Sequence, residues 1–318
     1  MSFSGMAFLL SLAVIFVNGW TDAPNAIATA VASGALSFRR AAGLAALCNL
    51  AGAVLSTLFF PAVARTVWSL AGSSGAAPVD LCAVFSAIVL WAAAAWRLGI
   101  PTSESHALLG GLAGAALAVP GGWTALDPAP WLAALAGLVL SLVLGFCLGG
   151  LSLPLLRGLS PKALRLGQIA GAAGMAFLHG AQDGQKFAGL LLFALPPHSV
   201  LSPAGAAFLC AAVMALGTLL GGRPIVEKVG KDLVPIRPLS GLSADVGGGI
   251  ALLLCTIAGL PVSTTHAKTA AVAGAGRADG QQVDRKCWRE LVLTWLFTFP
   301  GCGVLAFVLA RLSVLFSL

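Results

Sequence analysis

The sequence predicts an all-α polytopic membrane protein built from two related halves. Three observations predict this fold: an apolar composition, basic residues gathered into a few stretches, and polar motifs that occur twice at a fixed spacing. Of the 318 residues, 58% are hydrophobic and 9% are charged, and the mean hydropathy is +0.96. A soluble domain carries about 25% charged residues. The composition therefore excludes a soluble fold, and segments dominated by Ala, Leu, Gly and Val favour helices over a lipid-facing barrel.

The apolar sequence divides into about ten segments of the length that a helix needs to cross the hydrocarbon core. The segments are 3–36, 41–60, 80–98, 100–118, 131–156, 166–195, 204–220, 240–258, 260–276 and 290–316. Basic residues cluster in the connections at 39–40, 157–165, 223–237 and 277–289, whereas the other connections contain only Arg65. The positive-inside rule assigns the basic connections to the cytoplasm and both termini to the outside of the cell inner (plasma) membrane.

Five segments precede the central basic connection and five follow it, so the second half starts on the opposite side of the membrane from the first. This is the plan of two inverted-topology repeats, which we place at 1–156 and 157–318. The stretches 80–118 and 240–276 each fit either two full crossings or one re-entrant hairpin, and the sequence leaves that choice open.

Two polar motifs recur between the halves in the same order. Gly19-Trp20-Thr21-Asp22 matches Gly180-Ala181-Gln182-Asp183 at an offset of 161. The stretch Gly99-Ile100-Pro101-Thr102-Ser103-Glu104-Ser105-His106 matches Gly259-Leu260-Pro261-Val262-Ser263-Thr264-Thr265-His266 at an offset of 160. Two ordered matches at nearly equal offset indicate a duplication.

The two repeated aspartates are candidate binding residues. An ionised carboxylate near the bilayer centre costs at least about 2.5 kcal/mol on insertion scales, so Asp22 and Asp183 should face a polar cavity or partner. Polar residues and glycines interrupt both segments there, which predicts helices broken at membrane depth with ion-binding ends. Asn25 and Lys186 each follow three residues later, on the same helix face. Lys186 either neutralises Asp183 or contacts an anionic substrate, and the alternative role for the aspartates is a helix cap or an interfacial carboxylate.

The two Pro-x-Ser loops offer hydroxyl groups at the start of a half-helix, where backbone amides and the helix dipole bind anions. The hydroxyls belong to Ser103, Ser105, Ser263, Thr264 and Thr265. Two such loops from antiparallel halves predict a central site for a tetrahedral oxyanion. The alternative is that these hydroxyls only bond back to the helix backbone.

Four further residues flank the loops. His106 and His266 share one position of the repeat and are candidates for direct or supporting contacts, as is Lys268 after the second loop. Glu104 stands where the second half has Thr264, and it is an additional protonatable candidate.

At these motifs the chain resembles the PiT family of inorganic phosphate transporters, whose halves each carry a Gly-Ala-Asn-Asp-like signature and a Pro-Val-Ser-Thr-Thr-His-like loop. Residues 261–266 look like the family's loop unaltered, and residues 179–186 are similar to its second signature. The resemblance implies secondary active uptake of inorganic phosphate by cation symport through alternating access. It implies that Asp22, Asn25, Asp183 and the loop hydroxyls lie near phosphate and its coupling ion.

The chain departs from the family at three positions. Thr21 and Gln182 stand where the family usually has Asn, and Glu104 stands where it often has Thr. We expect these positions to shape the coupling-ion site, so sodium and a proton both remain open, with Na⁺ expected near Asp22 and Asp183. Because the family includes sulfate carriers, sulfate or another oxyanion is the alternative cargo.

Two other function classes are weighed against a carrier. A passive anion channel would use the same residues. A membrane hydrolase would use Ser103 or Ser263 as nucleophile, but the motif recurs in both halves and no third orienting group is visible in the sequence. We therefore expect no enzyme activity and no cofactor beyond the coupling cation. The net charge of +7 reports orientation in the membrane and does not indicate nucleic-acid binding. The expected partners are phosphate and the lipid bilayer. A homodimer is compatible with the sequence.

Overall fold

A computed structural model describes residues 3–74, 78–98, 102–119, 121–195 and 199–316 of the chain. Residues 99–101, which open the first predicted loop motif, lie outside this part. All regular elements in the described residues are helical. In chain order they are α1 (Phe3–Thr21), η1 (Ala23–Ile27), α2 (Ala28–Ala32), α3 (Phe38–Phe59), α4 (Ala62–Ser73), α5 (Pro78–Arg97), α6 (Glu104–Ala118), α7 (Gly122–Ala125), α8 (Pro128–Leu156), α9 (Pro161–His179), η2 (Gly180–Gly184), α10 (Gln185–Ala194), α11 (Pro203–Leu220), α12 (Arg223–Glu227), η3 (Lys228–Asp232), α13 (Pro238–Ile257), α14 (Thr264–Ala278) and α15 (Arg285–Phe316).

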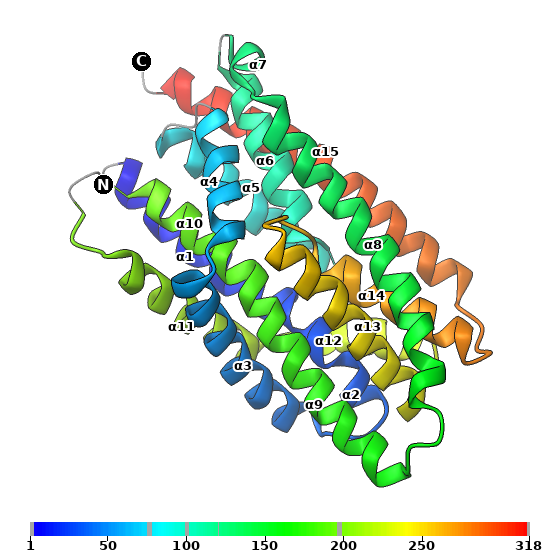
Figure 1. The fold of residues 1–318 in the computed structure, drawn as a ribbon. Coiled ribbons are helices and arrows are strands. Elements are labelled where there is room, and N and C mark those ends of the chain that lie inside the picture. Colours follow the sequence, from blue (N-terminus) through cyan, green and yellow to red (C-terminus); the bar gives the residue numbers. More distant parts are fainter. Residues whose placement is uncertain (1–2, 75–77, 99–101, 120, 196–198, 317–318) are drawn as a thin grey trace.

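The helices form an elongated bundle (Figure 1). The start of α1 and the end of α15 lie at one end of it, and the connections α2–α3, α8–α9 and α14–α15 lie at the other. Basic residues of the sequence lie in or directly beside these three connections. The start of α1 and the end of α15 therefore lie at the opposite end of the bundle from them, and the assignment of that end to the outside remains a prediction.

Seven helices of the described part are long and apolar enough to cross a membrane, which confirms the prediction of an all-helical multi-pass protein. They are Phe3–Ala32, Phe38–Phe59, Asp80–Arg97, Pro128–Leu156, Pro203–Leu220, Pro238–Ile257 and Arg285–Ser313. Three predicted segments are not among them. Two of these, α6 and α14, have 15 residues each and are about 22 Å long, shorter than a hydrocarbon core of about 30 Å. The third, α9 with α10, is interrupted and carries Asp183 and Lys186.

The predicted interruptions are present at both aspartates. In the first half, α1 ends at Thr21 and the chain continues through the 3₁₀-helix η1, where Pro24 removes a backbone donor. In the second half no proline lies near Asp183. There the helix widens instead into the π-helix η2. Such a π-segment is often found at functional sites because it displaces backbone groups and side chains from the regular helix.

Two buried apolar clusters lie on either side of the interruptions. The first cluster contains Val14 and Phe187, and the second contains Ile27 and Ala176. The segment α1–η1–α2 thus runs from the first cluster to the second, whereas α9–η2–α10 runs from the second to the first. The two broken helices therefore pass through the bundle in opposite directions.

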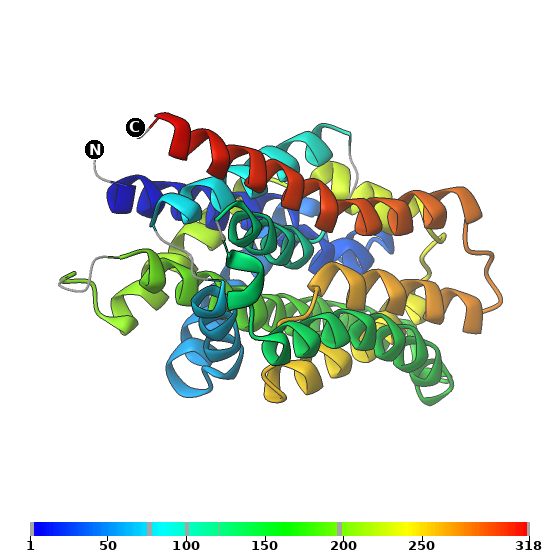
Figure 2. The ribbon, with the colours of Figure 1, turned by 90° about the horizontal axis from the view of Figure 1, so that it is seen from above.

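Helix contacts between the halves occur in matched pairs. The short helix α6 packs along α15, and its counterpart α14 packs along α8 (Figure 2). Both contacts need glycine, because a Cβ at Gly114 would lie 2.0 Å from the carbonyl oxygen of Gly303, and one at Gly274 would lie 2.0 Å from that of Phe146. Small residues let membrane helices approach closely. The matched contacts agree with the division at residue 156, which remains a prediction.

Candidate functional site

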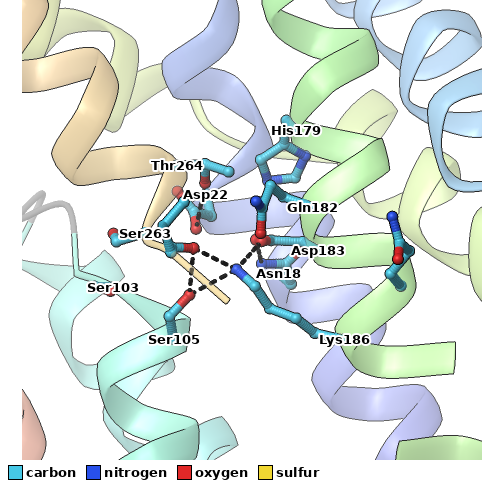
Figure 3. Close-up of polar contacts among 12 residues, drawn as sticks. Asn18, Asp22, Ser103, Ser105, His179, Gln182, Asp183, Lys186, Ser263 and Thr264 are labelled. Carbon is cyan, nitrogen blue, oxygen red and sulfur yellow. Dashed lines mark hydrogen bonds and ion pairs between the residues drawn. The ribbon is translucent and has the colours of Figure 1, made fainter. Parts of the chain in front are cut away.

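Buried polar side chains gather where the two broken helices meet the loops before α6 and α14 (Figure 3). They come from all four segments and from both halves of the chain. The members are Asn18, Thr21, Asp22, Asn25, Ser105, His179, Gln182, Asp183, Lys186, Thr264 and Thr265, each at most 5% exposed. The structure thus brings the predicted aspartates and loop hydroxyls into one cluster.

Asp22 is held by the second half of the chain. Its carboxylate accepts hydrogen bonds from the hydroxyls of Thr265 and Thr264, the latter at 3.3 Å. The amide nitrogen of Asn25 lies 3.1 Å from Asp22 Oδ1 and 3.0 Å from Thr265 Oγ1. Asp22, Asn25 and Thr265 therefore form a triad. Asp22 directly precedes η1, Asn25 lies in η1, and Thr265 lies in α14.

Asp183 is held by residues of both halves. Lys186 Nζ lies 2.6 Å from Asp183 Oδ1 and 2.8 Å from Ser105 Oγ, and it also donates to the carbonyl oxygen of Val262. The other carboxylate oxygen of Asp183 accepts from Asn18 Nδ2 at 2.9 Å. Asp183, Lys186 and Ser105 therefore form a second triad, with the hydroxyl again contributed by the other half.

Three side chains at the two aspartates are close enough together to hold one metal ion. Ligand atoms of Asp22, His179 and Asp183 all lie within 4.8 Å of one another. His179 Nδ1 is 2.9 Å from Asn49 Oδ1, and the Asn49 nitrogen donates to Thr218, so this pattern assigns the imidazole proton to Nδ1. The free Nε2 lone pair then faces Asp183 Oδ2 at 3.4 Å. Two electron-rich atoms this close are stable with a cation between them.

Sequence reasoning did not place His179 or Asn18 in the site. A signal was available for both, because each precedes a repeated aspartate by four residues and so shares its helix face.

The residues that depart from the resembled family, Thr21, Gln182 and Glu104, have different hydrogen-bond partners in the two halves. Thr21 donates to Glu104 Oε1 at 2.7 Å, and Glu104 Oε2 has no hydrogen-bond partner in the described part of the chain. Gln182 instead donates to Thr256 at 3.0 Å and to the carbonyl oxygen of Leu260 at 3.1 Å. Glu104 thus places a third buried carboxyl group beside Thr21 and Asp22.

Ser103 and Ser263 cap the helices α6 and α14. Each hydroxyl accepts from the backbone N–H three residues later, that of His106 at 3.3 Å and that of His266 at 3.2 Å. Such caps fix the position of a helix N-terminus. In α14 the first two amides, at residues 264–265, have no partner among the described residues. These donors remain available to an anion, whereas direct substrate contact by Ser103 and Ser263 remains a prediction.

The two loop histidines lie against each other behind the loops. The rings of His106 and His266 have centroids 4.5 Å apart, and His266 lies 4.2 Å from the ring of Trp295. In the described residues neither imidazole hydrogen-bonds to Asp22 or Asp183. His106 Nδ1 instead lies 2.9 Å from Ser103 Oγ, so its predicted support of the site would act through that cap residue.

Lys268 belongs to a second buried ion pair. Its Nζ contacts Asp245 Oδ1 and lies 3.0 Å from Thr29 Oγ1, which itself donates to Asp245 at 2.8 Å. Thr29 follows Asn25 by four residues, about one turn further along the chain. Sequence reasoning missed Asp245, although an acidic residue inside an apolar segment is a functional candidate.

Comparisons with known proteins show which proteins the chain is similar to. The sequence model of the phosphate transporter family matches residues 18–161 and 159–306. A probable low-affinity inorganic phosphate transporter of Bacillus subtilis (strain 168) is 33% identical over 308 residues, 92% of this chain and 91% of that protein. A protein of the same description from Mycobacterium bovis is 36% identical over 312 residues, 92% of this chain and 73% of that protein.

Among solved structures, "The sodium-dependent phosphate transporter" matches with a TM-score of 0.84. The match covers 99% of this chain and 100% of the other at 21% sequence identity. At this identity the match shows that the two chains share a fold.

Proposed function

The chain belongs to the phosphate transporter family, and from this membership we propose that it carries inorganic phosphate across the cell inner (plasma) membrane by cation symport. The observation that carries the proposal is the pair of triads, Asp22–Asn25–Thr265 and Asp183–Lys186–Ser105, which enclose one buried polar site from both halves. The family match agrees with the resemblance seen in the motifs, and the named relatives are transporters rather than enzymes. An intramembrane hydrolase is therefore set aside.

Phosphate suits this site because it can both accept and donate hydrogen bonds. The N-termini of α6 and α14 supply backbone donors to its oxygens. The hydroxyls of Ser105 and Thr265, which here donate to Val262 and Asp22, would turn to phosphate when it binds. Monohydrogen phosphate also carries an O–H group, which a carboxylate such as Asp22 can accept. Sulfate has no proton to donate at neutral pH and would only be repelled by that carboxylate. This difference favours phosphate over sulfate as cargo.

We propose that the coupling cation binds beside the two aspartates. Na⁺ would be held by Asp22, His179 and Asp183, whose ligand atoms lie close enough together for one ion. A proton would instead be carried by Glu104, the buried acid beside Thr21. Either cation offsets charge that the phosphate brings into a buried site.

Alternating access would arise from two inverted repeats, residues 1–156 and 157–318. The opposite directions of the two broken helices and the matched contacts of α6 and α14 support this division. The shortness of α6 and α14 supports re-entrant hairpins, α5–α6 and α13–α14, that bring both loops to the depth of the aspartates. The proposed orientation has both termini outside, and a homodimer is compatible with it.

The test is uptake of labelled phosphate into proteoliposomes with the sodium and pH gradients varied independently. We expect uphill accumulation driven by one of these gradients and little inhibition by excess sulfate. Flux that never exceeds electrochemical equilibrium would assign the protein to the anion channels. Counterflow that sulfate supports as well as phosphate would change the cargo.

A further inference from the structure

Lys186 occupies a position that the other half of the site fills with a neutral amide. The offset of 161 relates Asp22 to Asp183 and Asn25 to Lys186, and the hydroxyls of the two triads stand 160 residues apart. The triads are therefore equivalent in sequence position, although Thr265 contacts both Asp22 and Asn25 whereas Ser105 contacts only Lys186 of its triad, and at the third position an ammonium replaces an amide. This difference adds one fixed positive charge to a buried site.

The surroundings of the ammonium are those of a bound metal cation. Lys186 is 1% exposed, and its Nζ is surrounded by a carboxylate oxygen of Asp183, the hydroxyl oxygen of Ser105 and the carbonyl oxygen of Val262. Carboxylate, hydroxyl and carbonyl oxygens are the ligands that hard cations prefer. Nζ therefore stands where an oxygen-bound cation would otherwise be stable.

The ammonium is committed to these three oxygens. A lysine has three N–H donors, and three acceptors satisfy them all. A buried cation with a full set of partners gains little by turning toward an entering anion, because it would leave Asp183 unpaired. Of the two roles that the sequence left open for Lys186, the geometry favours neutralising Asp183 over contacting the substrate.

We propose that Lys186 is a tethered cation that takes the place of a mobile coupling ion. This inference rests on the proposed phosphate symport. Asp22, Asp183 and Lys186 together carry a formal net charge of −1, because two carboxylates face one ammonium. With an amide at position 186 the same residues would carry −2. An additional buried charge is costly in a membrane, so the site would recruit one more cation per transport cycle.

The experiment measures the charge moved with each phosphate. Purified protein in proteoliposomes is given opposing phosphate and electrical gradients, and the membrane potential at which net labelled-phosphate flux stops gives the charge per phosphate. This value counts sodium ions and protons alike. Relative to the unaltered protein, Lys186→Asn should raise it by one elementary charge. Lys186→Arg keeps a fixed cation and should leave it unchanged.

A mirror variant covers the case in which Lys186→Asn does not fold. Asn25→Lys adds a second tethered cation beside Asp22 and should lower the charge per phosphate by one. An equal or lower value for Lys186→Asn, or an unchanged value for Asn25→Lys, would overturn the inference. Absence of phosphate uptake by the unaltered protein would instead reject the proposed symport, so the two failures are distinguishable.

Discussion

The second buried ion pair, Lys268 with Asp245, gives a stability prediction that the structure allows us to size. Lys268→Met removes the ammonium but preserves most of the side-chain volume. Asp245 Oδ1 then keeps only the hydrogen bond from Thr29 at 2.8 Å, and Oδ2 has no partner among the described residues even before the change. The substitution therefore leaves a carboxylate buried, 2% exposed, without a counter-charge.

Removing one partner of a buried ion pair costs about 3 to 5 kcal/mol, because the remaining charge keeps its desolvation penalty. The double variant Asp245→Asn with Lys268→Met removes both charges, so it should lose about 1 to 2 kcal/mol, as for a few neutral hydrogen bonds. The double variant should therefore be more stable than Lys268→Met alone. Together with the single variant Asp245→Asn, these two variants complete a double-mutant cycle that gives the coupling free energy of the two charges.

Unfolding of the detergent-purified unaltered protein and its three variants, followed by tryptophan fluorescence, measures the four free energies of unfolding. Lys228→Met is the matched control, because Lys228 pairs with Glu290 at 2.8 Å in a partly exposed position. Exposed pairs contribute about 0 to 1 kcal/mol, so this control should change stability little. If the double variant is no more stable than Lys268→Met, the two charges do not compensate each other, and the reasoning fails.

Three further predictions concern the site and the packing around it. Asp22→Asn and Asp183→Asn should each abolish coupled accumulation of labelled phosphate while the protein stays inserted, and normal uptake by both would refute the two-aspartate site. Glu104→Gln should remove accumulation driven by a pH gradient but retain phosphate exchange at equal pH, so unchanged proton-driven uptake would place the proton elsewhere. Gly52→Ala should lower the free energy of unfolding by about 1 to 3 kcal/mol, since its Cβ would lie 1.9 Å from the carbonyl oxygen of Phe177; an unchanged unfolding midpoint would show that α3 and α9 can separate freely.

Apolar length was sufficient to predict the seven membrane-length helices of the described part, because hydrocarbon imposes helix length. The interruption at Asp22 was also predictable from Pro24 and the adjacent polar residues. The form of the second interruption was not. The π-helix around Asp183 depends on how its turn packs against α3, where a Cβ on Gly180 would lie 2.2 Å from the carbonyl oxygen of Asn49. Spacing within one segment carries no information about such a contact.

The membership of the triads was only half predictable. The repeat offset identified Asn25 and Lys186 as equivalent neighbours of the aspartates, but the hydroxyl partners Thr265 and Ser105 come from the opposite half. Which hydroxyl reaches which carboxylate depends on how the halves pack together. Ser263, which the sequence predicted to bind substrate, serves at least as a helix cap, a role that the preference for serine at N-caps could have indicated.

At two positions where the halves differ, the residues also differ in formal charge, and the two differences are opposite in sign. Relative to the equivalent residues Thr264 and Asn25, Glu104 adds a formal negative charge and Lys186 adds a positive one. Lys186 contacts Ser105, the residue next to Glu104, so both changes lie at the N-terminus of α6. The total formal charge of the cluster therefore equals that of a site with Thr and Asn at these positions. The new cation is fixed to the chain, whereas the new acid can exchange a proton, so the two changes together favour coupling to protons over coupling to a second metal cation.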